Sequence, residues 1–170
     1  MKDHLPERLD LLASADAGRV LQGRMKLASL PRLSPALSST DGELEVCLRL
    51  GQDPDGTRCL RGTIRGDIQL QCQRCLEPLA MALELGFCLG IVSDQASMEV
   101  LHERYEPILA GAEPASITDI VTDEVLLALP LVPAHADRGD CHEFVREYLP
   151  PEPEQDKGPF AVLAELKQKP

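Results

Sequence analysis

The chain has 170 residues, enough for one folded domain with a single core, and 44% of them are hydrophobic, as in globular proteins. Only 3% are aromatic, which argues against a surface that binds nucleic acid by stacking bases on aromatic rings. The net charge is −11, with Lys and Arg balancing Asp and Glu over residues 1–80 and an acidic excess over residues 81–170. Because phosphates are attracted by cations, we expect any RNA contact in the first half, while the acidic second half suits a basic protein partner or keeps the molecule soluble.

The N-terminal residues contain no apolar signal segment. The longest apolar stretch, residues 125–134, is too short to cross a bilayer and contains two prolines. We therefore expect a cytoplasmic protein with no membrane partner and with its six cysteines reduced.

Four stretches of alternating hydrophobicity predict the main structure. They cover residues 20–27, 43–50, 60–71 and 81–92, and each places apolar side chains on one face and polar ones on the other. Asp53-Pro54-Asp55-Gly56 is a strong turn signal between the second and third stretches. The predicted fold class is α+β: a twisted antiparallel sheet of four or more strands, able to curl toward a barrel, with a packed helix and an extended C-terminal arm.

The remaining elements are fewer. The spacing of Leu5, Leu9 and Leu12 predicts a short N-terminal helix, and a second short helix is expected over residues 97–104. Ser116 with Asp119 resembles a capping box and predicts a helix over residues 117–129, ended by Pro130.

The chain is thereby divided into two parts. Residues 1–136 are predicted to form a single α+β domain. Residues 137–170 are charged and proline-rich and predict an acidic extended arm, with a short C-terminal docking segment that includes Phe160 and Leu163.

Cys72-Gln73-Arg74-Cys75 lies at the tight turn between the last two predicted strands. Two thiols at such a turn can point at one spot and bind zinc, and the best further ligands are His135 and Cys141, with His142 as an alternative. A turn that has kept its shape without a metal is the competing interpretation. Redox chemistry is disfavoured, because a strand rather than a helix N-terminus follows the second cysteine.

No pattern supports catalysis, so we expect no enzyme activity. The four histidines lack a nucleophile motif nearby, and there is no glycine-rich phosphate loop. Asp123 and Glu124 are adjacent on a helix and diverge by about 100°, so they cannot act on one substrate atom together. They are better explained as an acidic helix face, either for solubility or for docking a partner.

The polar face of the predicted sheet offers a site for RNA. The cations expected there are Arg24, Lys26, Arg58, Arg61, Arg65 and Arg74. The competing interpretation is a solvated face on which Glu43, Glu45 and Asp67 balance these charges.

Three ordered motifs carry a family resemblance. The segment Cys-x-Arg-Cys-Leu-x-Pro at 72–78, the acidic segment DEVLLALPLVPAH at 123–135, and PFAVL at 159–163 with Leu166-Lys167 are similar to motifs of the YceD family, the bacterial large ribosomal RNA subunit accumulation proteins. Lys157-Gly158 stands where that family usually has Asn before the proline. Many members also have a second Cys-x-x-Cys in the region of His135 and Cys141, which this chain lacks.

The resemblance implies a non-enzymatic ribosome-biogenesis factor. Such a protein would support synthesis, processing or stability of 23S rRNA, with 23S rRNA or its precursor as a partner and a basic large-subunit ribosomal protein as a second. Two alternatives stay open from the residues: a zinc-dependent adaptor that binds a ribosomal protein without RNA contact, and a thiol oxidoreductase.

Overall fold

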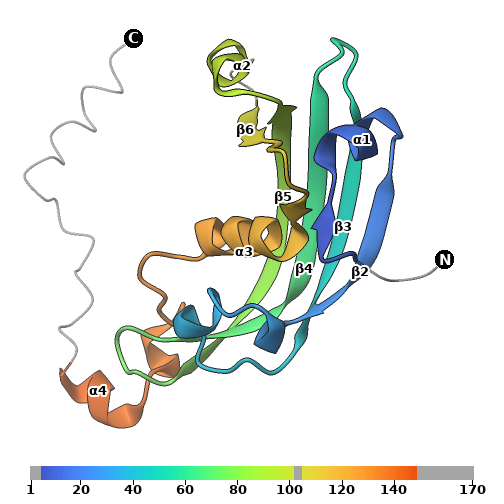
Figure 1. The fold of residues 1–170 in the computed structure, drawn as a ribbon. Coiled ribbons are helices and arrows are strands. Elements are labelled where there is room, and N and C mark those ends of the chain that lie inside the picture. Colours follow the sequence, from blue (N-terminus) through green and yellow to red (C-terminus); the bar gives the residue numbers. More distant parts are fainter. Residues whose placement is uncertain (1–4, 102–104, 149–170) are drawn as a thin grey trace, which may run out of the picture. The chain divides into compact units, whose positions relative to one another are not determined.

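The computed structural model describes residues 5–101 and 105–148 (Figure 1). The chain forms two compact units, residues 1–134 and residues 135–170. No helix in the described ranges is both long and apolar enough to cross a membrane.

The first unit is built on a five-stranded sheet in the order β2-β3-β4-β5-β6 (Figure 1). Its strands are β2 (Val20–Lys26), β3 (Glu43–Gln52), β4 (Arg58–Gln71), β5 (Pro78–Val92) and β6 (Glu106–Leu109). The first four form an antiparallel meander, and β6 pairs parallel to β5.

Short elements complete the two units. The first unit also contains β1 (Arg8–Leu9), α1 (Leu11–Asp16), the 3₁₀ turns η1 (Leu27–Ser29) and η2 (Ser34–Ala36), α2 (Gln95–Val100), β7 (Ala115–Ser116) and α3 (Ile117–Ala128). β1 pairs with β7 as a separate two-stranded sheet. Within residues 135–148, the second unit contains η3 (Arg138–Asp140) and α4 (Glu143–Tyr148).

One face of the main sheet forms the core. Leu48, Ile64 and Ile68 are at most 1% exposed, whereas the alternate residues Thr63 and Arg65 are exposed. This inner face packs with buried residues of α1, of the loop around η1 and η2, and of α3 into one hydrophobic cluster. The predicted alternation is thus confirmed, because a strand with one packed face repeats every two residues.

Helix α3 forms where its capping residues predict it. The side chain of Ser116 accepts a hydrogen bond from the backbone amide of Asp119 at 3.2 Å, and Val121 and Val125 are fully buried. The helix ends at Ala128, one residue before the predicted end, and Leu129, the residue before Pro130, is in an extended conformation.

The structure confirms the α+β class and adds details that the pattern did not contain. The sheet is open and does not form a barrel. Within the described residues β2 pairs only with β3 and β6 pairs only with β5, so these two are edge strands. The N-terminal helix begins at Leu11 rather than near Leu5, because Asp10 caps it by accepting from the amide of Ala13 at 2.9 Å. Leu9 instead belongs to β1. The arm predicted over residues 137–170 is described only as far as residue 148.

Candidate nucleic-acid interface and metal-ligand cluster

The outer face of the sheet is organised as rows that run across β2, β3, β4 and β5. The strand register places Val20, Arg49, Arg61 and Cys88 opposite one another in the first row, called the Arg49–Arg61 row below. The second row contains Gln22, Cys47, Thr63 and Gly86. The third, the Arg24–Glu84 row, contains Arg24, Glu45, Arg65 and Glu84. Directly opposed side chains on one face are neighbours that interact.

The Arg24–Glu84 row is neutralised internally. Arg24 Nη2 lies 2.9 Å from Glu45 Oε1, and Arg65 Nη2 lies 2.7 Å from Glu84 Oε1. Two of the predicted RNA-binding cations therefore alternate with carboxylates and carry no net charge as a row. At Arg24 and Arg65 the structure therefore has the solvated face with balanced charges that was the alternative to RNA contact.

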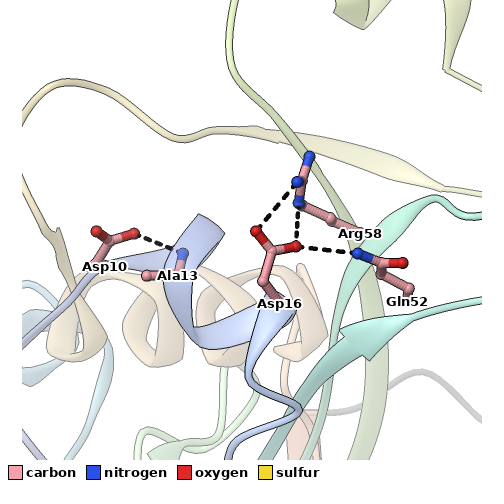
Figure 2. A network of polar contacts seen from close by, with 5 residues as sticks. All are labelled: Asp10, Ala13, Asp16, Gln52 and Arg58. Atoms are coloured by element: carbon pink, nitrogen blue, oxygen red, sulfur yellow. Dashed lines mark hydrogen bonds and ion pairs between the residues drawn. The ribbon is translucent and has the colours of Figure 1, made fainter.

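Arg58 is held by a structural contact instead of lying on the outer face. Figure 2 shows Asp16, at the end of α1, accepting hydrogen bonds from Arg58 Nε at 2.7 Å, Arg58 Nη2 at 3.1 Å and Gln52 Nε2 at 3.0 Å. The Arg58 guanidinium is the main cause that holds the pKa of the Asp16 carboxyl below its usual value. Arg58 thus links β4 to α1.

The other three predicted cations lie in three different places. Lys26 is exposed at the end of β2, opposite Glu43. Arg74 lies in the turn between the two cysteines and is half-buried. Arg61 is exposed in the middle of the Arg49–Arg61 row.

Arg49 is the residue that sequence reasoning missed. It is exposed and lies directly opposite Arg61, and within residues 5–101 and 105–148 neither guanidinium forms an ion pair with a carboxylate. Like charges directly opposite each other across two strands repel, and an anion between them removes the repulsion. The sequence places both residues on one face by parity, but only the register makes them neighbours.

A buried tyrosine closes the outer face near the β3–β4 turn. The Tyr105 hydroxyl donates a 2.6 Å hydrogen bond to Asp53 Oδ2 at that turn. Cys59, on β4 at this end of the outer face, is completely buried, and burial raises the pKa of its thiol. This thiol is therefore a poor nucleophile, which argues against redox chemistry at this end of the sheet.

The outer face is hollowed beside the Arg49–Arg61 row. The hollow has a volume of about 580 Å³ and is lined by Gln22, Gly23, Arg24, Glu45, Val46, Cys47, Thr63 and Arg65. Small-molecule sites are enclosed and mostly apolar, whereas most of the side chains here are polar or charged. Its chemistry suits a polar chain lying along the face better than an enclosed substrate.

The two cysteines of the predicted metal site lie in a tight turn between β4 and β5. Both are buried, and the backbone folds back on itself: the Leu76 amide donates to the Cys72 carbonyl at 2.8 Å, and the Cys72 amide to the Glu77 carbonyl at 2.9 Å. Leu76 has a φ of 62°, a left-handed conformation that costs a leucine roughly 1–2 kcal/mol. Such local strain is typical of functional sites.

His135 and Cys141 supply the other two predicted ligands. The Sγ atom of Cys141 lies 3.8 Å from Nδ1 of His135, and Cys141 is buried. His135 follows two residues after Pro133, whose carbonyl accepts a 2.8 Å hydrogen bond from the Gln73 amide in the cysteine turn. The four potential ligand atoms of Cys72, Cys75, His135 and Cys141 all lie within 4.8 Å of one another.

The donor set fits zinc. Three thiols and one imidazole form a standard structural zinc set, and tetrahedral bonds to sulfur of about 2.3 Å bring ligand atoms to about 3.8 Å from each other. These four residues could therefore hold a zinc ion.

The predicted docking residues lie partly in α3. Asp123 is exposed and pairs with Arg32 at 2.7 Å. Burial, followed by the nearby carboxylates of Glu106 and Asp123, raises the pKa of Glu124. The other two candidates, Phe160 and Leu163, lie outside the described residues.

Comparisons with known proteins give one consistent result. The sequence model of the family described as large ribosomal RNA subunit accumulation protein YceD matches residues 60–167. A protein of that name from Haemophilus influenzae is 34% identical over 172 residues, which cover 99% of this chain and 99% of the relative. No solved structure matches the chain.

Proposed function

This chain belongs to the YceD family of large ribosomal RNA subunit accumulation proteins, and from that premise we propose that it is a non-enzymatic factor that supports accumulation of 23S rRNA by contacting the RNA directly. The contact surface is the outer face of the sheet, centred on the Arg49–Arg61 row. The single observation that carries the proposal is the pair of opposed, exposed arginines without a carboxylate partner in the described residues.

The physical argument rests on local charge. The molecule as a whole is acidic and repels nucleic acid, so binding requires a place where cations are not cancelled. Two guanidiniums facing each other are suited to one phosphodiester, because each can donate two hydrogen bonds to its oxygens. Thr63 and Gln22, one row away, offer further polar contacts to the same strand of RNA.

The test is a salt titration of RNA binding. A 23S rRNA transcript is titrated with the full-length protein, with Arg49→Gln/Arg61→Gln, and with the matched control Arg8→Gln/Arg32→Gln. Removing two phosphate contacts is expected to weaken binding about tenfold or more near 0.1 M salt and to lower the salt slope by about 1.4–1.8. The control changes the net charge by the same amount at arginines that lie in β1 and beside α3 rather than on the outer face, so it should change binding little.

Two results would contradict direct RNA contact. One is equal weakening by both double variants, which would indicate a response to net charge alone. The other is unchanged binding by Arg49→Gln/Arg61→Gln. In cells, the same variant should reduce the level of large-subunit rRNA, whereas the control should not.

A zinc-dependent adaptor is the second candidate, and the Cys72–Cys75–His135–Cys141 cluster favours it. Bound zinc would brace the β4–β5 turn and stabilise the folded state, since a ligand that binds only that state adds to its stability. In this alternative the acidic residues of α3, Asp123 and Glu124, hold a basic large-subunit ribosomal protein, and RNA is not touched.

Metal analysis tests the adaptor. The purified full-length protein should contain one zinc per chain, Cys75→Ser should contain none, and the matched control Cys47→Ser should keep it, because Cys47 lies on the outer face of β3. If the purified wild-type protein contains no zinc, the zinc-dependent adaptor is wrong. If Cys75→Ser loses zinc but binds 23S rRNA normally, the metal supports the fold and not the RNA contact.

A further inference from the structure

An exposed apolar surface lies at the end of α3 and is not used by the RNA proposal. The exposed fractions are 72% for Leu127, 101% for Leu131 and 69% for Val132, and Leu76 in the cysteine turn is 64% exposed. The hydrogen bond between the Gln73 amide and the Pro133 carbonyl brings the turn and the segment after α3 to the same end of the unit. Clusters of large exposed apolar side chains mark binding surfaces more often than single ones do.

The shape of this surface is fixed by its backbone. Pro130 and Pro133 bracket Leu131 and Val132, which lie in bends after the helix, and the two prolines restrict the backbone so that the helix cannot continue through them. Leu127 lies four residues before Leu131. The apolar side chains are therefore displayed by a restrained segment rather than by a free loop.

The rim of the surface is acidic. Asp119 and Asp123 share the exposed face of α3 with Leu127, since they precede it by eight and four residues. Asp123 is already paired with Arg32 at 2.7 Å, so the remaining negative charge of the rim comes from Asp119, Glu106 and Glu124. Burial, followed by the nearby carboxylates of Glu106 and Asp123, raises the pKa of Glu124. The repulsion among these groups falls when a cation approaches, so the surface favours a positively charged occupant.

We propose that this α3 surface, formed by Leu76, Leu127, Leu131 and Val132 with Glu106 and Glu124 at its rim, binds a basic amphipathic helix of a protein partner. Leucines spaced along the partner helix would cover the apolar side chains, and its Lys or Arg residues would meet the acidic rim. The inference rests on the proposed function in one respect: a factor that acts on rRNA meets basic proteins that bind the same RNA.

Charge decides against the other occupants. RNA would bring phosphates against Glu106, Glu124 and Asp119. A second copy related by two-fold symmetry would bring the same acidic rim against itself, because such an interface places one patch on both sides. A basic helix is the occupant that gains from both the apolar centre and the rim.

The probe is a synthetic 18-residue Leu/Lys amphipathic helical peptide, titrated into the full-length protein and followed by fluorescence anisotropy. A peptide of the same composition in scrambled order is the control for net charge. Leu131→Ser is expected to weaken binding of the amphipathic peptide about tenfold, as loss of a central apolar contact does. The matched control Val20→Ser, at a side chain 56% exposed on β2, should leave the affinity unchanged. Glu106→Gln/Glu124→Gln should weaken binding and lower its salt dependence.

Four outcomes would overturn the proposal. Equal binding of the scrambled peptide would show attraction by net charge alone, and unchanged binding by Leu131→Ser would exclude this surface. Dimerisation in sedimentation that Leu131→Ser abolishes would assign the surface to a second copy. Tighter peptide binding by Phe160→Ser/Leu163→Ser in the full chain would assign it to the chain's own C-terminal segment.

Failure here is separable from failure of the RNA proposal. Arg49→Gln/Arg61→Gln should bind the peptide normally, and Leu131→Ser should bind 23S rRNA normally. Each pair of measurements therefore tests one surface only.

Discussion

The inner and outer faces of the β2–β5 sheet are formed by alternate residues of the same strands, yet they differ in what they tolerate. On the inner face Leu48 and Ile64 are fully buried, and nearly every position is apolar. On the outer face Arg49 and Thr63, their neighbours along the strands, are exposed. The inner face determines stability, so the outer face can carry a charge arrangement that costs some stability, such as the Arg49–Arg61 pair.

The outer face is itself not uniform. Its Arg24–Glu84 row consists of two ion pairs, whereas its Arg49–Arg61 row contains none within the described residues. Toward the β3–β4 turn it becomes buried beneath Tyr105. We therefore expect three kinds of position on the outer face. Those beneath Tyr105 stabilise the fold, those of the Arg24–Glu84 row are neutralised, and those of the Arg49–Arg61 row are available to bind a ligand.

The largest effect is expected from truncating the inner face. Ile64→Ala should destabilise the protein by about 3–4 kcal/mol, because the cavity adds to the lost transfer free energy. Thr63→Ala, one residue earlier on the outer face, should change stability by less than about 0.5 kcal/mol. Urea unfolding followed by circular dichroism measures both. Similar losses in the two variants would show that the outer face is covered and unavailable to RNA.

A smaller loss is expected where the outer face is buried. Tyr105→Phe removes the 2.6 Å hydrogen bond to Asp53, and a hydrogen bond to a charged group contributes about 1.5–3 kcal/mol. Thr63→Val is the matched control, since it also removes one hydroxyl and Thr63 is exposed on the outer face. If Tyr105→Phe is as stable as the control in urea, this end of the outer face is not structural.

The sequence predicts the faces but not the rows. Alternation fixes which side of the sheet each residue occupies, because a one-residue slip would expose the whole core. It leaves open which residue lies opposite, and that decides whether an arginine meets a glutamate or another arginine. Arg24 and Arg65 looked equivalent to Arg61 in the sequence, and the register separated them. Arg49 could have been found by counting residues outward from the Asp53–Gly56 turn.

The candidate metal ligands illustrate the same limit. Cys72 and Cys75 follow a recognised spacing, so a turn with convergent thiols could be predicted. His135 and Cys141 do not form a recognised ligand pair, and their proximity depends on tertiary contacts such as the one between Gln73 and Pro133. The parallel strand β6 was not predicted either. It has only four residues, too few to show an alternating pattern, and it forms by pairing with β5.

Releasing the neutralised row sharpens the comparison within the outer face. Glu45→Gln/Glu84→Gln frees Arg24 and Arg65, and we expect 23S rRNA to bind about three- to tenfold more tightly near 0.1 M salt, with a steeper salt slope. Glu7→Gln/Glu113→Gln changes the net charge equally in the segments that lead into the separate β1–β7 sheet and serves as the control. An equal gain in the control would mean that RNA responds to total charge and not to the rows.

The smallest effect on stability is expected from the ion pair between Arg58 of β4 and Asp16 of α1. Arg58 is the main cause that lowers the pKa of Asp16 from its ordinary 3.8, and a carboxyl with a lowered pKa in the folded state stabilises that state above its unfolded pKa. The stabilisation is lost as pH falls through the lower, folded pKa. Asp16→Asn should therefore lower the Tm slightly at pH 7 and converge with wild type below the folded pKa, and Arg58→Gln should behave alike. The ion pair is exposed and screened by water, so the difference should be small and should shrink further in high salt. A Tm difference that persists unchanged into acid would mean that Asp16 acts through its helix position rather than through Arg58.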